Sequence, residues 1–436
     1  MYRVPFDRGE ITFDLPAGWH GTVVESKVVP PIDDVPAAIA GALANPTNSP
    51  RLRDLAGPGD SVCIVFTDIT RASPDYLLVP PILAELEAAG VRDQDITLLC
   101  GIGLHRPSTP EEKVTKLGQE VVDRYRVIDN EPLNPDALVD LGTTESGIPL
   151  SVNKIAYDAD LLIATGIVEP HQYAGYSGAR KTLAVGAAGE AMIAYTHGPH
   201  MIDHPGTRLG RIEGNPFHEA VTEAARRAGL RFIVNVVQDD NKHVVYVGAG
   251  EPEATFQDLV AFARTLYEVP VPQQYDVAVA GVGYPKDANL YQASRAASYL
   301  FFGPTPVVKP GGLFIVPALC GEGAGEGIGE QRFLKAMQEA QNVAYILDDA
   351  REHGYPPGQQ RAFVMAKVLE ENDVLLVGCA DPALVESAKF LTAPTMEAAL
   401  ELARERLGDN LDVVIVPHAL LTLPIVQGNQ VSLSLD

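Results

Sequence analysis

Short apolar runs alternate with longer segments of helical periodicity along this chain, and that alternation limits the fold more than any other feature. The runs are continuous and rich in β-branched residues, which is typical of strands buried on both faces of a parallel sheet. Helical patterns lie between them, at residues 78–89, 216–228, 253–267 and 330–341. The expected strands are residues 61–67, 95–100, 160–166, 231–237, 275–281, 312–318, 373–378 and 412–417. We therefore predict an α/β protein with mostly parallel sheets.

A change of rhythm near residue 270 indicates a division into domains. The chain has 436 residues, which is long enough for two or three domains. Residues 268–274 (EVPVPQQ) read as an extended linker, and the strand pattern restarts after them. We expect an N-terminal α/β domain at 1–270 and a C-terminal α/β domain at 275–408. A last strand and tail at 409–436 could return to the N-terminal domain.

Charge and cysteine content exclude several classes of protein. The formal net charge of −24 disfavours binding to nucleic acid or to an anionic membrane. The four cysteines form no CxxC pair, which excludes a zinc ribbon or a thioredoxin-type motif. The N-terminus lacks the apolar region of a signal peptide, and no run of 18 apolar residues occurs. A cytoplasmic protein without a membrane span is therefore expected.

Polar residues gather directly after four of the expected strands. Because ligands of open α/β sheets bind at the carboxyl ends of strands, these segments are candidates for the functional site. The four segments are residues 68–71 (DITR), 101–107 (GIGLHRP), 169–182 (EPHQYAGYSGARKT) and 283–292 (GYPKDANLYQ).

Six of the ten histidines lie between residues 105 and 218. Three of them, His197, His200 and His204, follow the pattern H-x2-H-x3-H, and on one helical face this spacing could hold a metal. Glycine and proline residues within the same segment would interrupt such a helix. Two interpretations stay open: a three-histidine site, or one histidine ligand that acts beside groups from elsewhere.

Residues 175–182 (GYSGARKT) match a phosphate-binding loop only in part. Arg180 stands where the Walker pattern requires glycine, which disfavours an NTPase. Ser177 and Gly178 nevertheless precede an expected helix start, where backbone N–H groups attract a phosphate, and Lys181 adds positive charge. The alternative is an ordinary glycine turn with two solvated bases. A second glycine-rich stretch, residues 321–329, alternates glycine with acidic residues, and we interpret it as a flexible loop.

Four separated motifs together resemble the nickel-dependent lactate racemase family. They are GLHRP with His105, EPHQYAGYSGARK at 169–181, His197 sixteen residues after Lys181, and YPKDANLYQ at 284–292. The resemblance extends from Asp68 to at least Gln292 with similar spacing. It implies two α/β domains with the active site in the cleft between them.

The resemblance also implies a cofactor and a role for each matching residue. The family's cofactor is a nickel-pincer nucleotide, pyridinium-3-thioamide-5-thiocarboxylic acid mononucleotide with nickel, which depends on cofactor-synthesis proteins. The implied roles are His105 and His171 as the catalytic acid/base pair, His197 as the nickel ligand, Lys181 as the attachment point, Asp68, Ser177, Gly178, Arg180 and Tyr291 as cofactor contacts, and Arg71, Gln292 and Arg295 as substrate contacts. The sequence leaves open whether Lys181 is attached covalently and which oligomeric state forms.

The chemistry of racemisation accounts for such a set of residues. The Cα–H of a 2-hydroxy acid is too weak an acid for imidazole, but its removal as hydride becomes easier when the neighbouring hydroxyl loses its proton. The planar 2-oxo acid that results can take the hydride back on either face. Two enantiomers present their hydroxyls on opposite sides and need two bases, for which imidazoles with a pKa near the working pH are suited. An arginine fork matches the substrate carboxylate.

Two departures from the family pattern predict a substrate larger or more polar than lactate. Arg295 stands where the pattern has lysine, and residues 358–362 (GQQRA) replace a segment that contains tryptophan. A nicotinamide-dependent oxidoreductase is disfavoured, because Arg106 occupies the third-glycine position of the fingerprint after residues 101–103. The alternatives are a nicotinamide-independent 2-hydroxyacid oxidoreductase and a non-catalytic ligand or metal carrier of the same fold.

Overall fold

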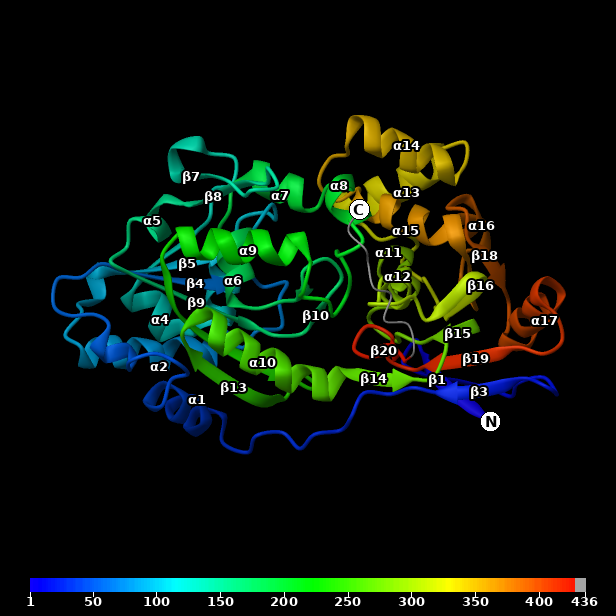
Figure 1. Cartoon of the computed structure of the whole chain (residues 1–436), viewed down its shortest axis with the longest axis horizontal. Coiled ribbons are helices and arrows are strands. Elements are labelled where there is room, and N and C mark those ends of the chain that lie inside the picture. Colours follow the sequence, from blue (N-terminus) through cyan, green and yellow to red (C-terminus); the bar gives the residue numbers. More distant parts are fainter. Residues whose placement is uncertain (428–436) are drawn as a thin grey trace.

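Two six-stranded sheets organise the chain into two α/β domains that lie side by side along the longest axis (Figure 1). The computed structural model describes residues 1–427. Within that range, no helix combines the length and the apolar character needed to cross a membrane. The α/β class and the mostly parallel sheets agree with the prediction from the sequence.

The first sheet has the strand order β13-β12-β9-β4-β5-β6, and all neighbours are parallel except β12 and β13. Its strands are β4 (Val62–Thr67), β5 (Ile96–Gly101), β6 (Arg126–Asp129), β9 (Leu161–Ile167), β12 (Leu230–Gln238) and β13 (Val244–Gly250). The helices of this domain are α1 (Val35–Ala44), α2 (Asp75–Ala88), α3 (Pro110–Leu117), α4 (Gln119–Arg124), α5 (Lys154–Tyr157), α6 (Ala179–Lys181), α7 (Glu190–Thr196), α8 (Pro199–Asp203), α9 (Pro216–Arg227) and α10 (Pro252–Tyr267). Helices cover both faces, so every residue of β4 is buried, which explains its continuous apolar sequence.

The second sheet has the strand order β18-β17-β16-β15-β19-β3 and is parallel throughout. Its strands are β3 (His20–Val23), β15 (Tyr275–Ala280), β16 (Val308–Pro317), β17 (Asp373–Val377), β18 (Leu391–Ala393) and β19 (Asp412–Val416). Its helices are α11 (Leu290–Ala293), α12 (Arg295–Phe301), α13 (Ile328–Glu339), α14 (Val343–His353), α15 (Gln360–Glu371), α16 (Pro382–Ser387) and α17 (Met396–Leu407).

Both ends of the described chain contribute to the second sheet. The expectation placed residues 1–270 in the N-terminal domain and left the last strand open to return there, but β3 and β19 pair with each other at the edge of the second sheet. The short strand β3 has one neighbour only, and Val23 is half exposed, so its sequence carries no pattern of a buried strand.

Within residues 1–427, four two-stranded sheets complete the fold. They are β1 (Tyr2–Phe6) with β2 (Gly9–Phe13), β7 (Leu138–Thr143) with β8 (Pro149–Asn153), β10 (Pro170–His171) with β11 (Gly175–Tyr176), and β14 (Glu268–Val271) with β20 (Leu423–Val426). The last pair is parallel, so the segment expected to be a linker is extended but also holds the returning end of the chain.

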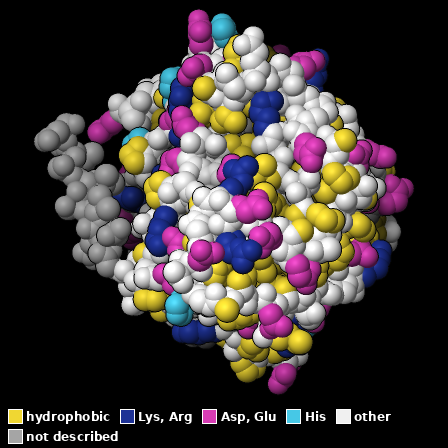
Figure 2. Space-filling view, turned by 90° about the vertical axis from the view of Figure 1, so that its right-hand side faces the viewer, with side chains coloured by type: hydrophobic (Ala, Val, Ile, Leu, Met, Phe, Trp, Pro, Cys, Tyr) yellow, Lys and Arg dark blue, Asp and Glu magenta, His cyan; other side chains and the backbone are white. Residues whose placement is uncertain are grey.

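A shared apolar core joins the two domains. Met192 of α7 and Phe217 of α9 belong to the same buried cluster as Phe301 of α12 and Phe363 of α15. Helix α8 lies between the domains in Figure 1 and contacts α14 and α15. On the end face of the second domain, acidic side chains alternate with basic ones and do not form a single patch (Figure 2).

Candidate active site

A cavity of about 800 Å³ lies between the domains, where the carboxyl ends of β4, β5 and β9 face the second domain. The side chains that line it include Asp68, Arg71, His105, Glu169, His171, Ser177, Lys181 and His197 from the first domain, and Tyr291, Ile328, Arg332, Tyr355 and Gln360 from the second. The strand-end segments of the sequence thus meet in one cleft, as parallel strands require.

His105 and Asp68 follow neighbouring parallel strands, β5 and β4, and their side chains form a pair in the cleft. His105 Nδ1 lies 2.7 Å from Asp68 Oδ2, and the exposed fraction is 47% for the His105 side chain but 6% for that of Asp68. Burial by itself raises the pKa of Asp68, but the interactions with His105, Thr70 and Arg71 together outweigh it and hold that pKa below its ordinary value. Asp68 is therefore a carboxylate that orients the His105 ring.

A buried ion pair between Asp75 and Lys116 lies close to the segment that carries Asp68 and Arg71, and the sequence analysis did not predict it. The carboxylate of Asp75 is fully buried and lies 2.8 Å from Lys116 Nζ. Thr67 at the end of β4 and Thr165 in β9 also donate hydrogen bonds to that carboxylate. Lys116 donates in addition to the carbonyl of Ser73. The network ties two strand ends to the segment that carries Asp68 and Arg71, but its residues are ordinary helix and strand residues in the sequence.

His171 lies in the tight hairpin of β10 and β11. Its Nδ1 accepts hydrogen bonds from the backbone N–H groups of Tyr173, at 3.3 Å, and Ala174, at 3.2 Å. Burial, followed by the positive charges of Lys181 and Arg71, holds the pKa of His171 well below its ordinary value. This differs from the expectation of two imidazoles that titrate near the working pH, because the sequence does not show how deeply the ring is buried.

Glu169 lines the same wall and was named in the sequence only as part of the EPH segment. Burial raises its pKa, although the nearby positive charges of Arg71, Arg295 and Lys181 oppose that effect. A carboxyl group with a raised pKa in a cleft is a candidate functional group.

Lys181 ends the short helix α6, and the turn before it is fixed by its backbone. Gly178 has φ +148°, and a Cβ atom there would lie 3.1 Å from the Phe256 ring, so the turn requires glycine. Ser177 Oγ donates to the carbonyl of Ile167 at 2.6 Å. Burial lowers the pKa of Lys181 to about 7, so its amine is partly neutral near neutral pH.

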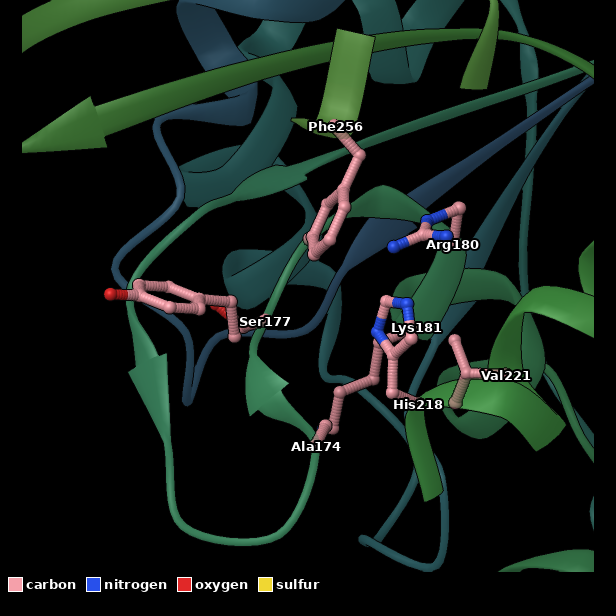
Figure 3. Close-up of a pocket in the computed structure, with 9 residues that line it drawn as sticks. Ala174, Ser177, Arg180, Lys181, His218, Val221 and Phe256 are labelled. Carbon is pink, nitrogen blue, oxygen red and sulfur yellow. The ribbon is translucent and has the colours of Figure 1, made fainter. Parts of the chain in front are cut away.

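Arg180 does not line the cleft, although the sequence predicted a cofactor contact for it. Its guanidinium lies over the ring of Phe256, 3.8 Å from the centroid (Figure 3). It also donates to Thr222 Oγ1. A second, very small cavity with Arg180, Lys181 and His218 in its wall lies on this side of α6 (Figure 3). Successive helical residues point in different directions, so Lys181 faces the cleft while Arg180 does not.

His197 directly follows the last residue of α7, and its ring is held in one orientation. Its Nδ1 lies 3.0 Å from the carbonyl oxygen of Ile193, which can only accept, so the proton is on Nδ1 and Nε2 keeps its lone pair. Burial and the charge of Lys181 lower the pKa of His197 to about 3. The Tyr173 and Phe217 rings meet it edge to face. An imidazole oriented in this way fits a metal.

The other two histidines of the H-x2-H-x3-H pattern do not join it. His200 is exposed, and His204 Nδ1 accepts from the backbone of Gly206. Across residues 1–427, no three side chains of His, Cys, Asp or Glu converge as a metal site. His197 Nε2 is thus a single available nitrogen donor, and the cleft has room for a group that supplies further ligands.

Of the three residues predicted in the segment 291–295 of the second domain, one lines the cleft and two do not. Tyr291 lines the cleft, with its ring edge to face on Phe333. The Arg295 guanidinium donates instead to Gln292 Oε1, at 3.1 Å, and to the Tyr299 hydroxyl, at 2.7 Å, and neither Gln292 nor Arg295 is among the residues that line the cleft.

The loop at 358–361 meets the cleft through only some of its residues. Gly358 and Gln360 line the cleft, whereas Arg361 turns inward and donates to Ser298 Oγ at 2.9 Å. Among the described residues of the second domain, Arg332 is the one charged residue that lines the cleft. The sequence analysis did not identify it, because it follows the glycine-rich stretch at 321–329 that was interpreted as a flexible loop.

Comparisons with known proteins agree across the whole chain. The model of the lactate racemase N-terminal domain matches residues 6–210, and that of the lactate racemase C-terminal domain matches residues 272–423. A lactate racemase of Lactiplantibacillus plantarum is 32% identical over 384 residues, which are 87% of this chain and 88% of that protein. A lactate racemase of Thermoanaerobacterium thermosaccharolyticum is 30% identical over 424 residues, which are 95% of this chain and 97% of that protein.

Solved structures show the same likeness. The lactate racemase apoprotein from Thermoanaerobacterium thermosaccharolyticum superposes with a TM-score of 0.85 at 28% identity, covering 97% of this chain and 99% of that one. A protein from Thermotoga maritima superposes with a TM-score of 0.63 at 18% identity, covering 92% of this chain and all of that one, and shows the fold alone.

Proposed function

The chain belongs to the lactate racemase family and is an isomerase of hydroxy acids, and on that premise we propose that it racemises or epimerises a 2-hydroxy acid with a nickel-pincer nucleotide in the interdomain cleft. The observation that supports this most directly is the juxtaposition of His105, His171, Lys181 and His197 around one cavity. When bound, such a cofactor supplies a hydride acceptor.

His197 would bind the nickel through Nε2, because Nδ1 already donates to the Ile193 carbonyl. Lys181 would form the attachment to the cofactor, since an amine with a pKa near 7 is partly unprotonated and nucleophilic. Asp68, Ser177 and Gly178 at the strand ends, together with Tyr291 from the second domain, would contact the rest of the nucleotide.

The substrate would be held and deprotonated by side chains of the first domain. Arg71 lines the cleft beside Asp68 and would bind the substrate carboxylate with its planar fork. His105 and His171 would handle the hydroxyl proton of a substrate between them, and removal of that proton favours departure of the Cα hydrogen as hydride. The resulting planar 2-oxo acid loses its handedness, and return of the hydride to either face gives either enantiomer.

The test is to load the protein by co-expression with cofactor-synthesis proteins and to measure nickel content and racemisation together. His197→Ala should lose the bound nickel, while His105→Ala and His171→Ala should keep nickel but lose turnover, as followed by chiral chromatography. His200→Ala is the matched control, because His200 is exposed, and it should keep both. Nickel retained at full stoichiometry in His197→Ala, or normal racemisation by either catalytic variant, would contradict the proposal.

We further propose that the substrate is larger or more polar than lactate. Arg332 and Gln360 offer polar groups to the cleft from the second domain, and one charge-assisted hydrogen bond is worth about 1.5–3 kcal/mol, or roughly 10–100-fold in selectivity. Because neither Arg295 nor its partner Gln292 is among the residues that line the cleft, an effect of Arg295 on substrate choice would be indirect.

A panel of 2-hydroxy acids tests that choice with the loaded enzyme, comparing wild type with Arg332→Gln and Arg295→Lys. Longer or more polar acids should give a higher kcat/KM than lactate, and Arg332→Gln should reduce that preference. Lactate as the best substrate, with the ranking unchanged in both variants, would show the proposal to be wrong.

A further inference from the structure

The two candidate bases differ in what surrounds their ring nitrogens, and the first of them faces a carboxylate. His105 Nδ1 lies 2.7 Å from Asp68 Oδ2. A carboxylate has no proton to give, so Nδ1 must donate. In the neutral ring of His105 the proton is therefore on Nδ1, and Nε2 carries the lone pair.

The ring of His171 is in the opposite state. Its Nδ1 accepts from two backbone N–H groups, those of Tyr173 and Ala174. A backbone N–H can only donate, so Nδ1 carries no proton and the neutral ring has its proton on Nε2.

The turn that imposes this state on His171 is fixed by its neighbours. Asn215 Nδ2 donates to the Tyr173 carbonyl at 2.8 Å from a fully buried position. Gly175 has φ +75°, and its Cα packs so closely on the backbone of Arg211 that a Cβ atom would not fit. Moving the His171 proton to Nδ1 would break both backbone hydrogen bonds within this packed hairpin.

We propose that the two histidines are held in opposite tautomers, so that the resting site offers one proton acceptor, His105 Nε2, and one hydrogen-bond donor, His171 Nε2–H. This inference rests on the proposed function for its catalytic meaning. For the enantiomer whose hydroxyl faces His105, the O–H bond breaks and an N–H bond forms at Nε2. The oxygen electron pair becomes the carbonyl bond as hydride leaves Cα for the acceptor. His171 meanwhile donates a hydrogen bond to a substrate oxygen.

The hydroxyl of the other enantiomer faces His171, whose Nε2–H is a hydrogen-bond donor, whereas deprotonation of that hydroxyl requires a nitrogen with a free lone pair. His171 must first transfer its ring proton from Nε2 to Nδ1 through solvent, which costs the hydrogen bonds from Tyr173 and Ala174. The enzyme is therefore set for one hand of the substrate. Enantiomers have equal free energies, so kcat/KM is the same in both directions. The values of kcat and KM can still differ separately, and a single half-reaction shows the asymmetry most directly.

Tautomers can be measured directly in the purified protein without cofactor, by 15N NMR after selective labelling of histidine. The shifts of protonated and unprotonated ring nitrogens differ, and His105→Gln and His171→Gln assign the two rings. We expect the Nδ1–H form for His105 and the Nε2–H form for His171. In Asp68→Ala the His105 preference should disappear while the His171 signals stay unchanged. The same tautomer for both rings, or an unchanged His105 in Asp68→Ala, would overturn the inference.

A second measurement uses the loaded enzyme in a single turnover. Glutamine keeps an N–H donor but cannot take up a proton, so His171→Gln should still form 2-oxo acid from one enantiomer, at an amplitude within about 3-fold of wild type. His105→Gln should form none from that enantiomer. Equal loss in both variants would refute the assigned roles. Failure of the loaded wild-type enzyme to form 2-oxo acid from either hand would instead count against the proposed function, and the NMR result would stand separately.

Discussion

The buried pair of Asp75 and Lys116 makes a sharp prediction about stability, tested by the substitution Lys116→Met. Methionine fills a similar volume but leaves the fully buried Asp75 carboxylate without its counter-charge. Removing one partner of a buried ion pair costs about 3–5 kcal/mol. The lower part of that range applies here, because hydrogen bonds from Thr67 and Thr165 still stabilise the carboxylate. We expect a loss of about 3 kcal/mol in the free energy of unfolding.

Urea denaturation followed by far-UV circular dichroism measures this loss. Arg404→Met is the matched control. Arg404 pairs with Glu401 on the surface, where both side chains are about half exposed, so this variant should be far less destabilised than Lys116→Met. The double variant Asp75→Asn, Lys116→Met should be more stable than Lys116→Met alone, since a neutral amide is cheaper to bury than an unpaired carboxylate. A loss below about 1 kcal/mol in Lys116→Met, or a double variant no more stable than Lys116→Met alone, would refute the reasoning.

Three further predictions concern other parts of the molecule. Burial lowers the pKa of His218 to about 4, so between pH 6.5 and 4 this histidine is protonated in the unfolded chain but neutral in the folded chain. The free energy of unfolding should therefore fall by up to about 3 kcal/mol as the pH drops from 6.5 to 4. Urea titrations of His218→Gln should lack that part of the loss. Lys181, with a pKa of about 7, should be acylated faster at pH 8 than the other lysines when the cofactor-free protein is treated with acetic anhydride and mapped by mass spectrometry. Asp203 in α8 pairs across the domains with Arg351 and Lys367, so Asp203→Asn should speed hydrogen exchange in α8, and unchanged exchange would show that the pairs do not hold the domains together.

The sequence was sufficient to predict a residue's location where its position in a strand or helix also determines its surroundings. Buried parallel strands need apolar residues on both faces, so strands such as β4 and β9 were recognisable, and their ends located Asp68 and His171 in one cleft. The motif at 169–181 likewise placed Lys181 beside them.

The direction in which a side chain points could not be predicted from its place in a strand or helix pattern. Arg180 and Lys181 are adjacent in the sequence, yet only Lys181 faces the cleft. Arg295 satisfies its donors with Gln292 and Tyr299 within its own domain, while Arg332, which followed no recognised motif, lines the cleft. The partners of Arg180, Thr222 and Phe256, come from distant segments, and those of Arg295 lie within one helical turn, but in both cases packing decides which way the side chain points.

The pairing of β3 with β19 has a consequence for the order of events during synthesis. Asp412 lies opposite His20, so the first strand of the second sheet to leave the ribosome pairs with the last. At the usual pace of translation, the roughly 390 residues between them take about 20–80 s to make. During that interval β3 has no neighbouring strand, and for most of it Val4 and Phe13 of the β1–β2 hairpin lack the strands of the second sheet on which they pack. The first domain can collapse around its own sheet within that time, whereas the second sheet closes only after β19 has emerged. Of the described segments, β1 to β3 therefore wait longest for their partners and are exposed longest to chaperones and proteases.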